Sequence, residues 1–76
     1  MATTITIPRL EMAMTEGTLA EWLVEDGAEV KEGDVIYILE TEKAAQDIEA
    51  PASGRLARKV EAGSVYPVGT EIGEIA

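Results

Sequence analysis

The side chain best suited to chemistry in this sequence is the amine of Lys43. The chain contains no cysteine and no histidine, so a thiol nucleophile, an imidazole base and the common zinc and haem ligands are missing. Lys43 stands between Glu42 and Ala44 near the middle of 76 residues, whereas the other two lysines are Lys31 and Lys59. An exposed lysine amine is protonated at neutral pH and is a poor nucleophile. We therefore expect Lys43 to be the target of a modifying enzyme rather than a catalyst.

Independent catalysis is not expected from this chain. The sequence offers no pairing of nucleophile and base, and it has no glycine-rich phosphate loop. A phosphopantetheine carrier would need a serine at the start of a helix, but Ser53 and Ser64 both lie in glycine-containing turn sequences. The function classes that remain are a carrier of another kind and an unmodified adaptor.

The charge of the chain narrows its partners. Fifteen acidic residues against six basic ones give a net charge of −9, which disfavours binding to nucleic acid and to anionic membranes. The longest apolar run, residues 35–39, is too short to span a bilayer, and the first residues do not resemble a signal peptide. We expect a cytoplasmic protein, or a mitochondrial matrix protein in a eukaryote. The acidity favours either simple solubility or docking on basic partners.

The sequence pattern predicts that the elements positioning Lys43 are strands. The hydrophobic content of 46% is enough for a compact core, and β-branched runs alternate with turn sequences. The expected strands cover residues 4–7, 18–24, 35–40, 45–49, 55–60 and 70–75, with a bridge at Val30 and a short edge piece at 65–69. We expect one all-β domain over residues 1–76, with Trp22 in its core.

Two halves of the chain look alike. Three glycines and two apolar residues of the first half recur after 36 or 37 residues. The pairs are Gly17 with Gly54, Gly27 with Gly63, Gly33 with Gly69, Leu19 with Leu56, and Val24 with Val60. Seven glycines in a small β protein could align by chance, but five pairs in one register favour an internal repeat. The repeat predicts a flattened barrel or sandwich of two small antiparallel sheets with pseudo-two-fold symmetry.

Residues 40–49, between the two halves, pose a conflict. Their glutamate, lysine, alanine and glutamine residues are strong helix formers, so the segment read alone has about even odds of being a helix. A helix ending at Pro51 would have only about two turns, however, and the repeat needs a tight central link. We therefore predict a hairpin that places Lys43 at or beside its tip. A lysine at the tip of a hairpin is usually only a solvated charge. Lys43 differs from such a lysine because it lies at the midpoint of the repeat.

Several motifs of this sequence resemble those of a known protein family. The segment Glu40-Thr41-Glu42-Lys43-Ala44 resembles the Thr-Asp-Lys-Ala attachment motif of the lipoyl (biotinyl-like) domain family. Further matches are Gly27 and Gly54 around the lysine, Ala50-Pro51-Ala52-Ser53-Gly54, Ile7-Pro8 with Leu10, and Met14 with Glu16-Gly17-Thr18. The short attachment motif is weak by itself, but these spacings extend the resemblance over the full chain.

The resemblance implies a carrier function. A lipoate ligase or lipoyl transferase would join lipoic acid to the Lys43 amine, and the resulting swinging arm would carry acyl groups and electrons within a 2-oxoacid or acetoin dehydrogenase complex. The implied partners are a thiamine-diphosphate-dependent decarboxylase or dehydrogenase, an acyltransferase catalytic domain and dihydrolipoyl dehydrogenase. Missing cysteine and histidine fit this function, since the cofactor brings the sulfur. The isolated domain would be monomeric, without turnover of its own.

Residues near Lys43 carry further expectations. Glu42 and Ala44 would help the ligase accept the lysine. The alternative, which has nearly the same weight, is that both are ordinary turn residues. The loop at residues 10–16 would lie beside the hairpin and aid recognition by partners, or it is simply a surface loop. Met12 and Met14 within it are alternatively core plugs. Glu42 replaces the commoner aspartate but keeps its charge, whereas Glu11 and Met12 depart from the small or polar residues of many relatives.

Two other functions remain open. A biotin carrier shares the fold, but biotin acceptors resemble Met-Lys-Met, unlike the flanks Glu42 and Ala44. An unmodified β adaptor predicts that Lys43→Arg or Lys43→Gln leaves function unchanged. The sequence leaves open the substrate acid, with a weak preference for pyruvate or acetoin, and whether the carrier is free-standing or part of a larger acyltransferase.

Overall fold

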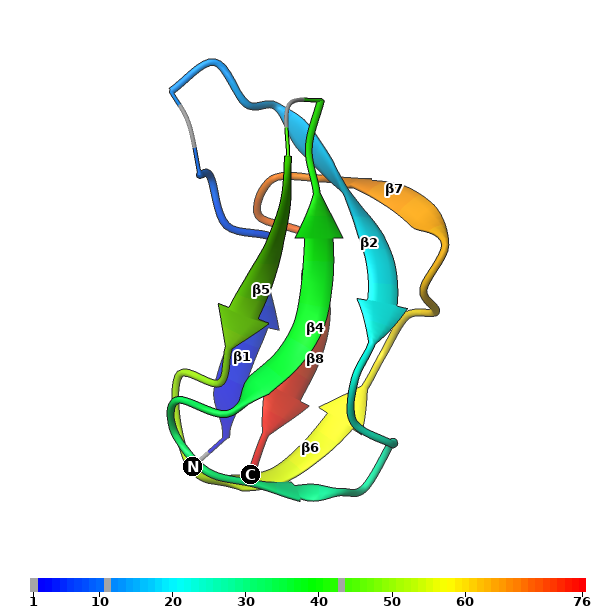
Figure 1. Ribbon diagram of the computed structural model, residues 1–76. Coiled ribbons are helices and arrows are strands. Elements are labelled where there is room, and N and C mark those ends of the chain that lie inside the picture. Colours follow the sequence, from blue (N-terminus) through cyan, green and yellow to red (C-terminus); the bar gives the residue numbers. More distant parts are fainter. Residues whose placement is uncertain (1, 11, 43) are drawn as a thin grey trace.

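The computed structural model describes residues 2–10, 12–42 and 44–76, and within these ranges it contains eight strands arranged in two sheets (Figure 1). The strands are β1 (Thr3–Thr6), β2 (Glu16–Trp22), β3 (Glu29–Val30), β4 (Val35–Glu40), β5 (Ala45–Glu49), β6 (Gly54–Arg58), β7 (Ser64–Pro67) and β8 (Glu71–Ile75). One sheet has the order β1-β8-β6-β3 and the other β5-β4-β2-β7, and all pairings are antiparallel. The prediction of an all-β flattened sandwich is confirmed.

The central hairpin is also confirmed, and the helical alternative for residues 40–49 is wrong. β4 and β5 have the predicted bounds, and their ladder runs from Val35 opposite Glu49 to Glu40 opposite Ala45. Cross-strand pairing therefore overrides the helix propensity of the segment, as tertiary context often does. β2 begins two residues earlier than predicted, because Glu16 already pairs with Pro67 of β7.

The pairing registers confirm the internal repeat. Leu19 of β2 lies opposite Leu39 of β4, and Leu56 of β6 lies opposite Ile75 of β8. The first pair maps onto the second with shifts of 37 (56 − 19) and 36 (75 − 39) residues, the shifts of the glycine repeat. The ladders β4–β5 and β8–β1 likewise correspond, and each contains one irregularity at the matching place. The two sheets, each of which combines strands of both halves, are therefore equivalent and face each other.

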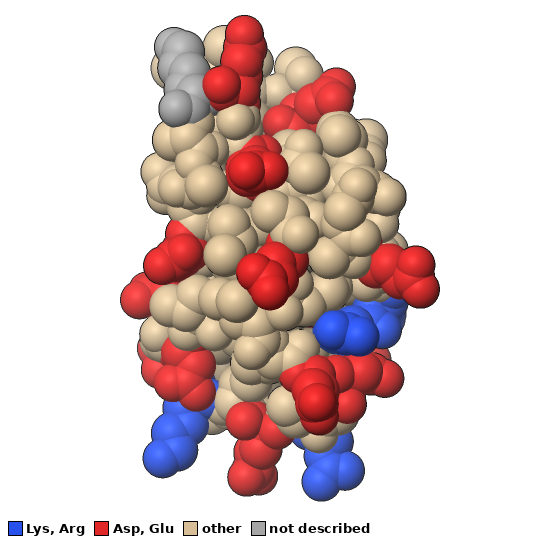
Figure 2. Space-filling model, turned by 45° about the vertical axis from the view of Figure 1, so that its right-hand side comes forward, with Lys and Arg blue, Asp and Glu red and all other residues tan. Residues whose placement is uncertain are grey.

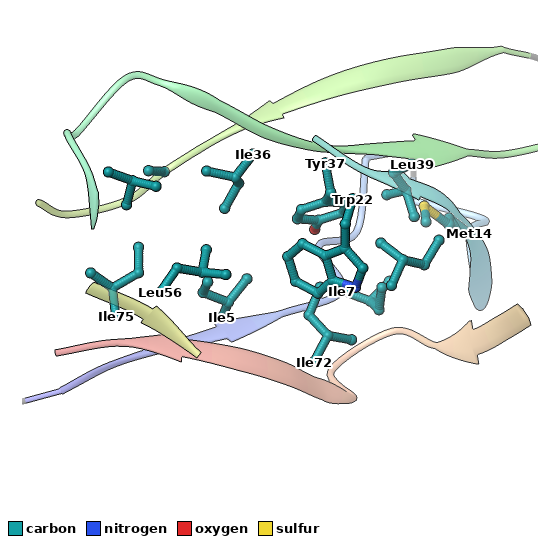
Figure 3. Close-up of a cluster of buried hydrophobic side chains, with 13 residues drawn as sticks. Ile5, Ile7, Met14, Trp22, Ile36, Tyr37, Leu39, Leu56, Ile72 and Ile75 are labelled. Carbon is teal, nitrogen blue, oxygen red and sulfur yellow. The ribbon is translucent and has the colours of Figure 1, made fainter. Parts of the chain in front are cut away.

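The core lies between the two sheets and is mostly aliphatic (Figure 3). Eight side chains are almost completely inaccessible: Tyr37, Ile7, Leu19, Ile36, Leu39, Leu56, Ile72 and Ile75. Each such burial contributes roughly 1.5–3 kcal/mol relative to an exposed side chain. Trp22 is 9% exposed, so its prediction as a core residue is confirmed. The core-plug alternative is right for Met14, which is 8% exposed, and wrong for Met12, which is 96% exposed in a turn of the loop.

The overall shape separates the hairpin from the chain termini. Both termini lie at one end, where β1 pairs with β8 and Thr3 faces Ile75, while the tip of the β4–β5 hairpin lies at the other end (Figure 1). The longest dimension of the molecule is 31 Å. Across the described part of the chain there is no helix of the length and apolar character needed to cross a membrane.

Candidate functional site

The connection between β4 and β5 is a short turn closed by Thr41 and Ala44. The backbone N–H of Thr41 donates to the carbonyl of Ala44 at 2.8 Å, and the Thr41 hydroxyl donates to the same oxygen at 3.1 Å. The N–H of Ala44 points back at the Thr41 hydroxyl oxygen at 3.4 Å, a long and weak contact. Glu42 and Lys43 are the two residues that the turn encloses in the sequence.

The predicted attachment residue, Lys43, lies outside the described residues, so its assignment stays a prediction. Its sequence neighbours are both described: Glu42 and Ala44 are exposed, and Thr41 is half-buried. The turn therefore presents the two predicted flanking residues to solvent. Their role in recognition by a ligase also remains a prediction.

One strand of the hairpin anchors it in the core. On β4, the side chains of Ile36, Tyr37 and Leu39 are fully buried. On β5, by contrast, Ile48 alone is half-buried, and every other side chain of this edge strand is exposed. Because core packing restrains β4 while β5 lies on the surface, the position of the turn is set mainly by β4.

Gly17 lets β2 pass closely beside the hairpin base. A Cβ atom on Gly17 would lie 2.8 Å from Leu39 Cδ1 and 2.9 Å from Met14 Cε, closer than van der Waals contact permits. The sequence identified Gly17 as part of the repeat, but it did not reveal this close approach. The absence of a side chain here lets both Leu39 and Met14 pack under β2.

A shallow recess of about 520 Å³ lies beside the turn. The residues that line it come from β2 and the segment before it, from the hairpin and from β7: Thr15, Glu16, Thr18, Glu40, Thr41, Glu42 and Val65. The end of the loop at residues 10–16 thus lies next to the hairpin, as expected from the resemblance. Whether that loop takes part in recognition stays a prediction.

The surface around the hairpin is acidic. In Figure 2, acidic side chains extend from the hairpin end over the visible face, whereas those basic side chains of that face that belong to described residues lie toward the opposite end. Away from the hairpin, Lys59 donates a hydrogen bond to Glu71. This bond raises the pKa of the Lys59 amine, and nearby Glu74 adds to the effect.

No group of histidine, cysteine and carboxylate side chains suited to a metal ion occurs within the described ranges.

Sequence reasoning included Thr41 in the attachment motif but assigned no role to its side chain. It placed the turn correctly from strand lengths and the repeat, but side-chain hydrogen bonds depend on the turn conformation that the chain adopts. The one available signal was the residue type, since threonine hydroxyls bond to nearby backbone groups in turns.

The chain is similar to known proteins over almost its whole length. A family model described as "Biotin-requiring enzyme" matches residues 3–75. The dihydrolipoyllysine-residue acetyltransferase component of pyruvate dehydrogenase complex from Rhizobium meliloti is 46% identical over 71 residues, covering 93% of this chain and 15% of that protein. The corresponding component of the acetoin cleaving system from Cupriavidus necator is 44% identical over 73 residues, 95% of this chain and 20% of the relative.

A third relative belongs to another complex. The dihydrolipoyllysine-residue succinyltransferase component of 2-oxoglutarate dehydrogenase complex from Rickettsia bellii is 34% identical over 76 residues, with 99% of this chain and 19% of the relative covered. The chain thus spans a fifth or less of the length of these three curated relatives.

Proposed function

The chain belongs to the biotin and lipoyl attachment family, and from this we propose that it is a lipoyl carrier domain in which Lys43 receives lipoic acid through an amide bond. The observation that carries the proposal is the closed turn between β4 and β5, in which Thr41 and Ala44 enclose Glu42 and Lys43. A turn of this kind is accessible to a second enzyme, and Glu42 and Ala44 on either side of the lysine are exposed.

The residues present fit a covalently attached arm. Amide formation removes the charge of the lysine amine, and the exposed flanks leave room for a modifying enzyme. When bound, lipoic acid supplies a disulfide that can be reduced and acylated, which provides the sulfur chemistry that this sequence lacks. The domain contributes a firm base, since the buried side chains of β4 fix the hairpin in the core.

We further propose that the carrier serves a 2-oxoacid or acetoin dehydrogenase complex. The relatives at 46% and 44% identity are named for pyruvate dehydrogenase complex and the acetoin cleaving system, and the one at 34% for 2-oxoglutarate dehydrogenase complex. This order favours a pyruvate or acetoin substrate. The arm would visit a thiamine-diphosphate-dependent enzyme, an acyltransferase and dihydrolipoyl dehydrogenase, and tethering would hold the carried group at high effective concentration.

The test is the site of modification. The protein is produced with lipoate and a lipoate ligase, and its intact mass and peptide masses are measured. We expect the mass to increase by one lipoyl group, located on Lys43 and lost in Lys43→Arg. The matched control Lys31→Arg makes the same exchange at another lysine and should remain modified. A lipoyl group on Lys31 or Lys59, or an unmodified protein, would contradict the proposal.

Biotin is the alternative to be separated from lipoate, because the matching family is described as biotin-requiring. The flanks Glu42 and Ala44 favour lipoate over biotin. Incubation of one sample with a biotin ligase and biotin, and of another with a lipoate ligase and lipoate, gives the comparison. Biotin on Lys43 without lipoate would assign the domain to a carboxylase instead.

A further inference from the structure

Three contacts between Thr41 and Ala44 are found among the described residues of the turn, and the Thr41 side chain takes part in two of them. The backbone bond from Thr41 N to the Ala44 carbonyl exists whatever the side chain at position 41. The hydroxyl adds a second bond to that carbonyl at 3.1 Å and is the acceptor for the N–H of Ala44 at 3.4 Å. Both ends of the turn are therefore linked by one side chain.

These contacts matter because, among the described residues of the turn, the ladder and the core provide little further restraint. Regular pairing of β4 with β5 ends at Glu40 opposite Ala45, so the enclosed residues are outside the ladder. Ala44 and Glu42 are exposed and have no core packing to hold them. The branched Cβ of threonine restricts χ1, which limits the placements that are open to the hydroxyl. The Thr41 hydroxyl thus reduces the conformations that Glu42 and Ala44 can adopt.

We propose that Thr41 is a positioning residue for the modification of Lys43. Its hydroxyl links to Ala44 and holds the two neighbours of the lysine in the arrangement that the modifying enzyme recognises. The inference rests on the proposed function, because it concerns the same lysine. It differs from the roles predicted for Glu42 and Ala44, since Thr41 acts on the shape of the turn.

The experiment compares Thr41→Val with Thr41→Ser. Valine keeps the branched shape and removes the hydroxyl, whereas serine keeps the hydroxyl. The fraction of protein in the binding-competent turn limits the apparent affinity. We therefore expect Thr41→Val to raise the KM of lipoate ligase for the domain roughly fivefold, the effect of one lost hydrogen bond, with kcat unchanged. Thr41→Ser should keep the KM of the wild type within about twofold.

The control is Thr70→Val, which removes the hydroxyl of another half-buried threonine outside the recess. It should leave the KM unchanged. Trp22 fluorescence establishes that each variant is folded at the assay temperature, so a change in KM cannot come from global unfolding. A Thr41→Val protein with the KM of the wild type, or a Thr41→Ser protein as impaired as Thr41→Val, would overturn the inference.

A second measurement needs no modification of the lysine. Amide hydrogen exchange of Ala44 should be faster in Thr41→Val than in the wild type or in Thr41→Ser, because the turn loses both contacts of the hydroxyl with Ala44. Equal exchange in all three proteins would overturn the positioning role even if the ligase modifies Lys43. Conversely, faster exchange in Thr41→Val together with a wild-type domain that the ligase ignores would refute the proposed function, and with it the role of Thr41 in modification, while leaving the turn contacts established.

Discussion

The rings of Trp22 and Tyr37 contact each other across β2 and β4, with centroids 5.5 Å apart and planes inclined by 57°. The indole N–H donates to the carbonyl of Val60 at 3.1 Å, and the guanidinium of Arg58 lies 5.8 Å from the Trp22 ring centroid. The Tyr37 hydroxyl, in contrast, is buried without a hydrogen-bond partner among the described residues. The one tryptophan therefore reports on a part of the core that contains an unpaired polar group.

Replacing Tyr37 by phenylalanine should stabilise the protein. The substitution removes an unpaired buried hydroxyl and keeps the ring, so we expect the free energy of unfolding to rise by about 1–2 kcal/mol. Urea unfolding followed by Trp22 fluorescence measures the change. The matched control is Tyr66→Phe, which loses the hydrogen bond from the Tyr66 hydroxyl to the Glu61 carbonyl and should be neutral or slightly destabilising. A loss of stability in Tyr37→Phe would mean that the hydroxyl is paired in solution.

The same phenol predicts a loss of stability at alkaline pH. Burial raises the pKa of Tyr37 from 10.0 to about 12. The folded state then holds the phenol proton more tightly than the unfolded state, so the contribution is complete below pH 10 and disappears as the pH rises from 10 to 12. The expected loss is up to about 2–3 kcal/mol. Unfolding curves across this range test it: the wild type should lose more stability than Tyr37→Phe, and parallel losses would contradict the prediction.

The two methionines of the loop should differ in their reaction with peroxide. Met12 is 96% exposed, whereas Met14 is 8% exposed and its sulfur accepts a hydrogen bond from the N–H of Leu10 at 3.3 Å. Since oxidation to the sulfoxide follows exposure, Met12 should react at least about tenfold faster. Peptide mass mapping over time measures both rates. Denatured protein is the control, in which the difference should vanish; equal rates in the folded protein would contradict the structure.

Alanine should be tolerated less well at Gly73 than at Gly17. A Cβ on Gly73 would lie 2.6 Å from the backbone carbonyl oxygen of Ala57 in the neighbouring strand, whereas the three atoms nearest to a Cβ on Gly17 belong to the side chains of Leu39 and Met14. Side chains can move aside, but a paired backbone cannot do so without breaking the ladder. We expect Gly73→Ala to cost about 1–3 kcal/mol and Gly17→Ala less. Urea midpoints of the two variants provide the comparison, and the reverse order would argue against the close packing of β8 on β6.

At position 73 the two halves of the fold differ in the size of their side chains. The shift of 36 residues makes Gly73 the counterpart of Tyr37, and Trp22 Cη2 lies 3.6 Å from the Cβ that Gly73 lacks. The first half therefore supplies both large rings, and the second half supplies the space beside them. A symmetric backbone thus encloses an asymmetric core.

The sequence predicted the hairpin and the repeat well, because both depend on patterns spread over many residues. Glycine spacing, strand lengths and the position of Pro51 together outweighed the helix propensity of residues 40–49. Details that depend on one side chain were less accessible. Met12 and Met14 are of one type and two residues apart, yet the path of the loop alone decides that Met14 is buried. The contacts of Thr41 similarly depend on the final turn geometry.

The pairing of β1 with β8 has a consequence for how such a unit could be built into other proteins. Because Thr3 faces Ile75, the entry and exit points of the chain are neighbours. Domains whose ends are close together can be inserted into a loop of a host protein without spreading the host open. This fold could therefore be grafted into a surface loop by short spacers, with its hairpin facing away from the host.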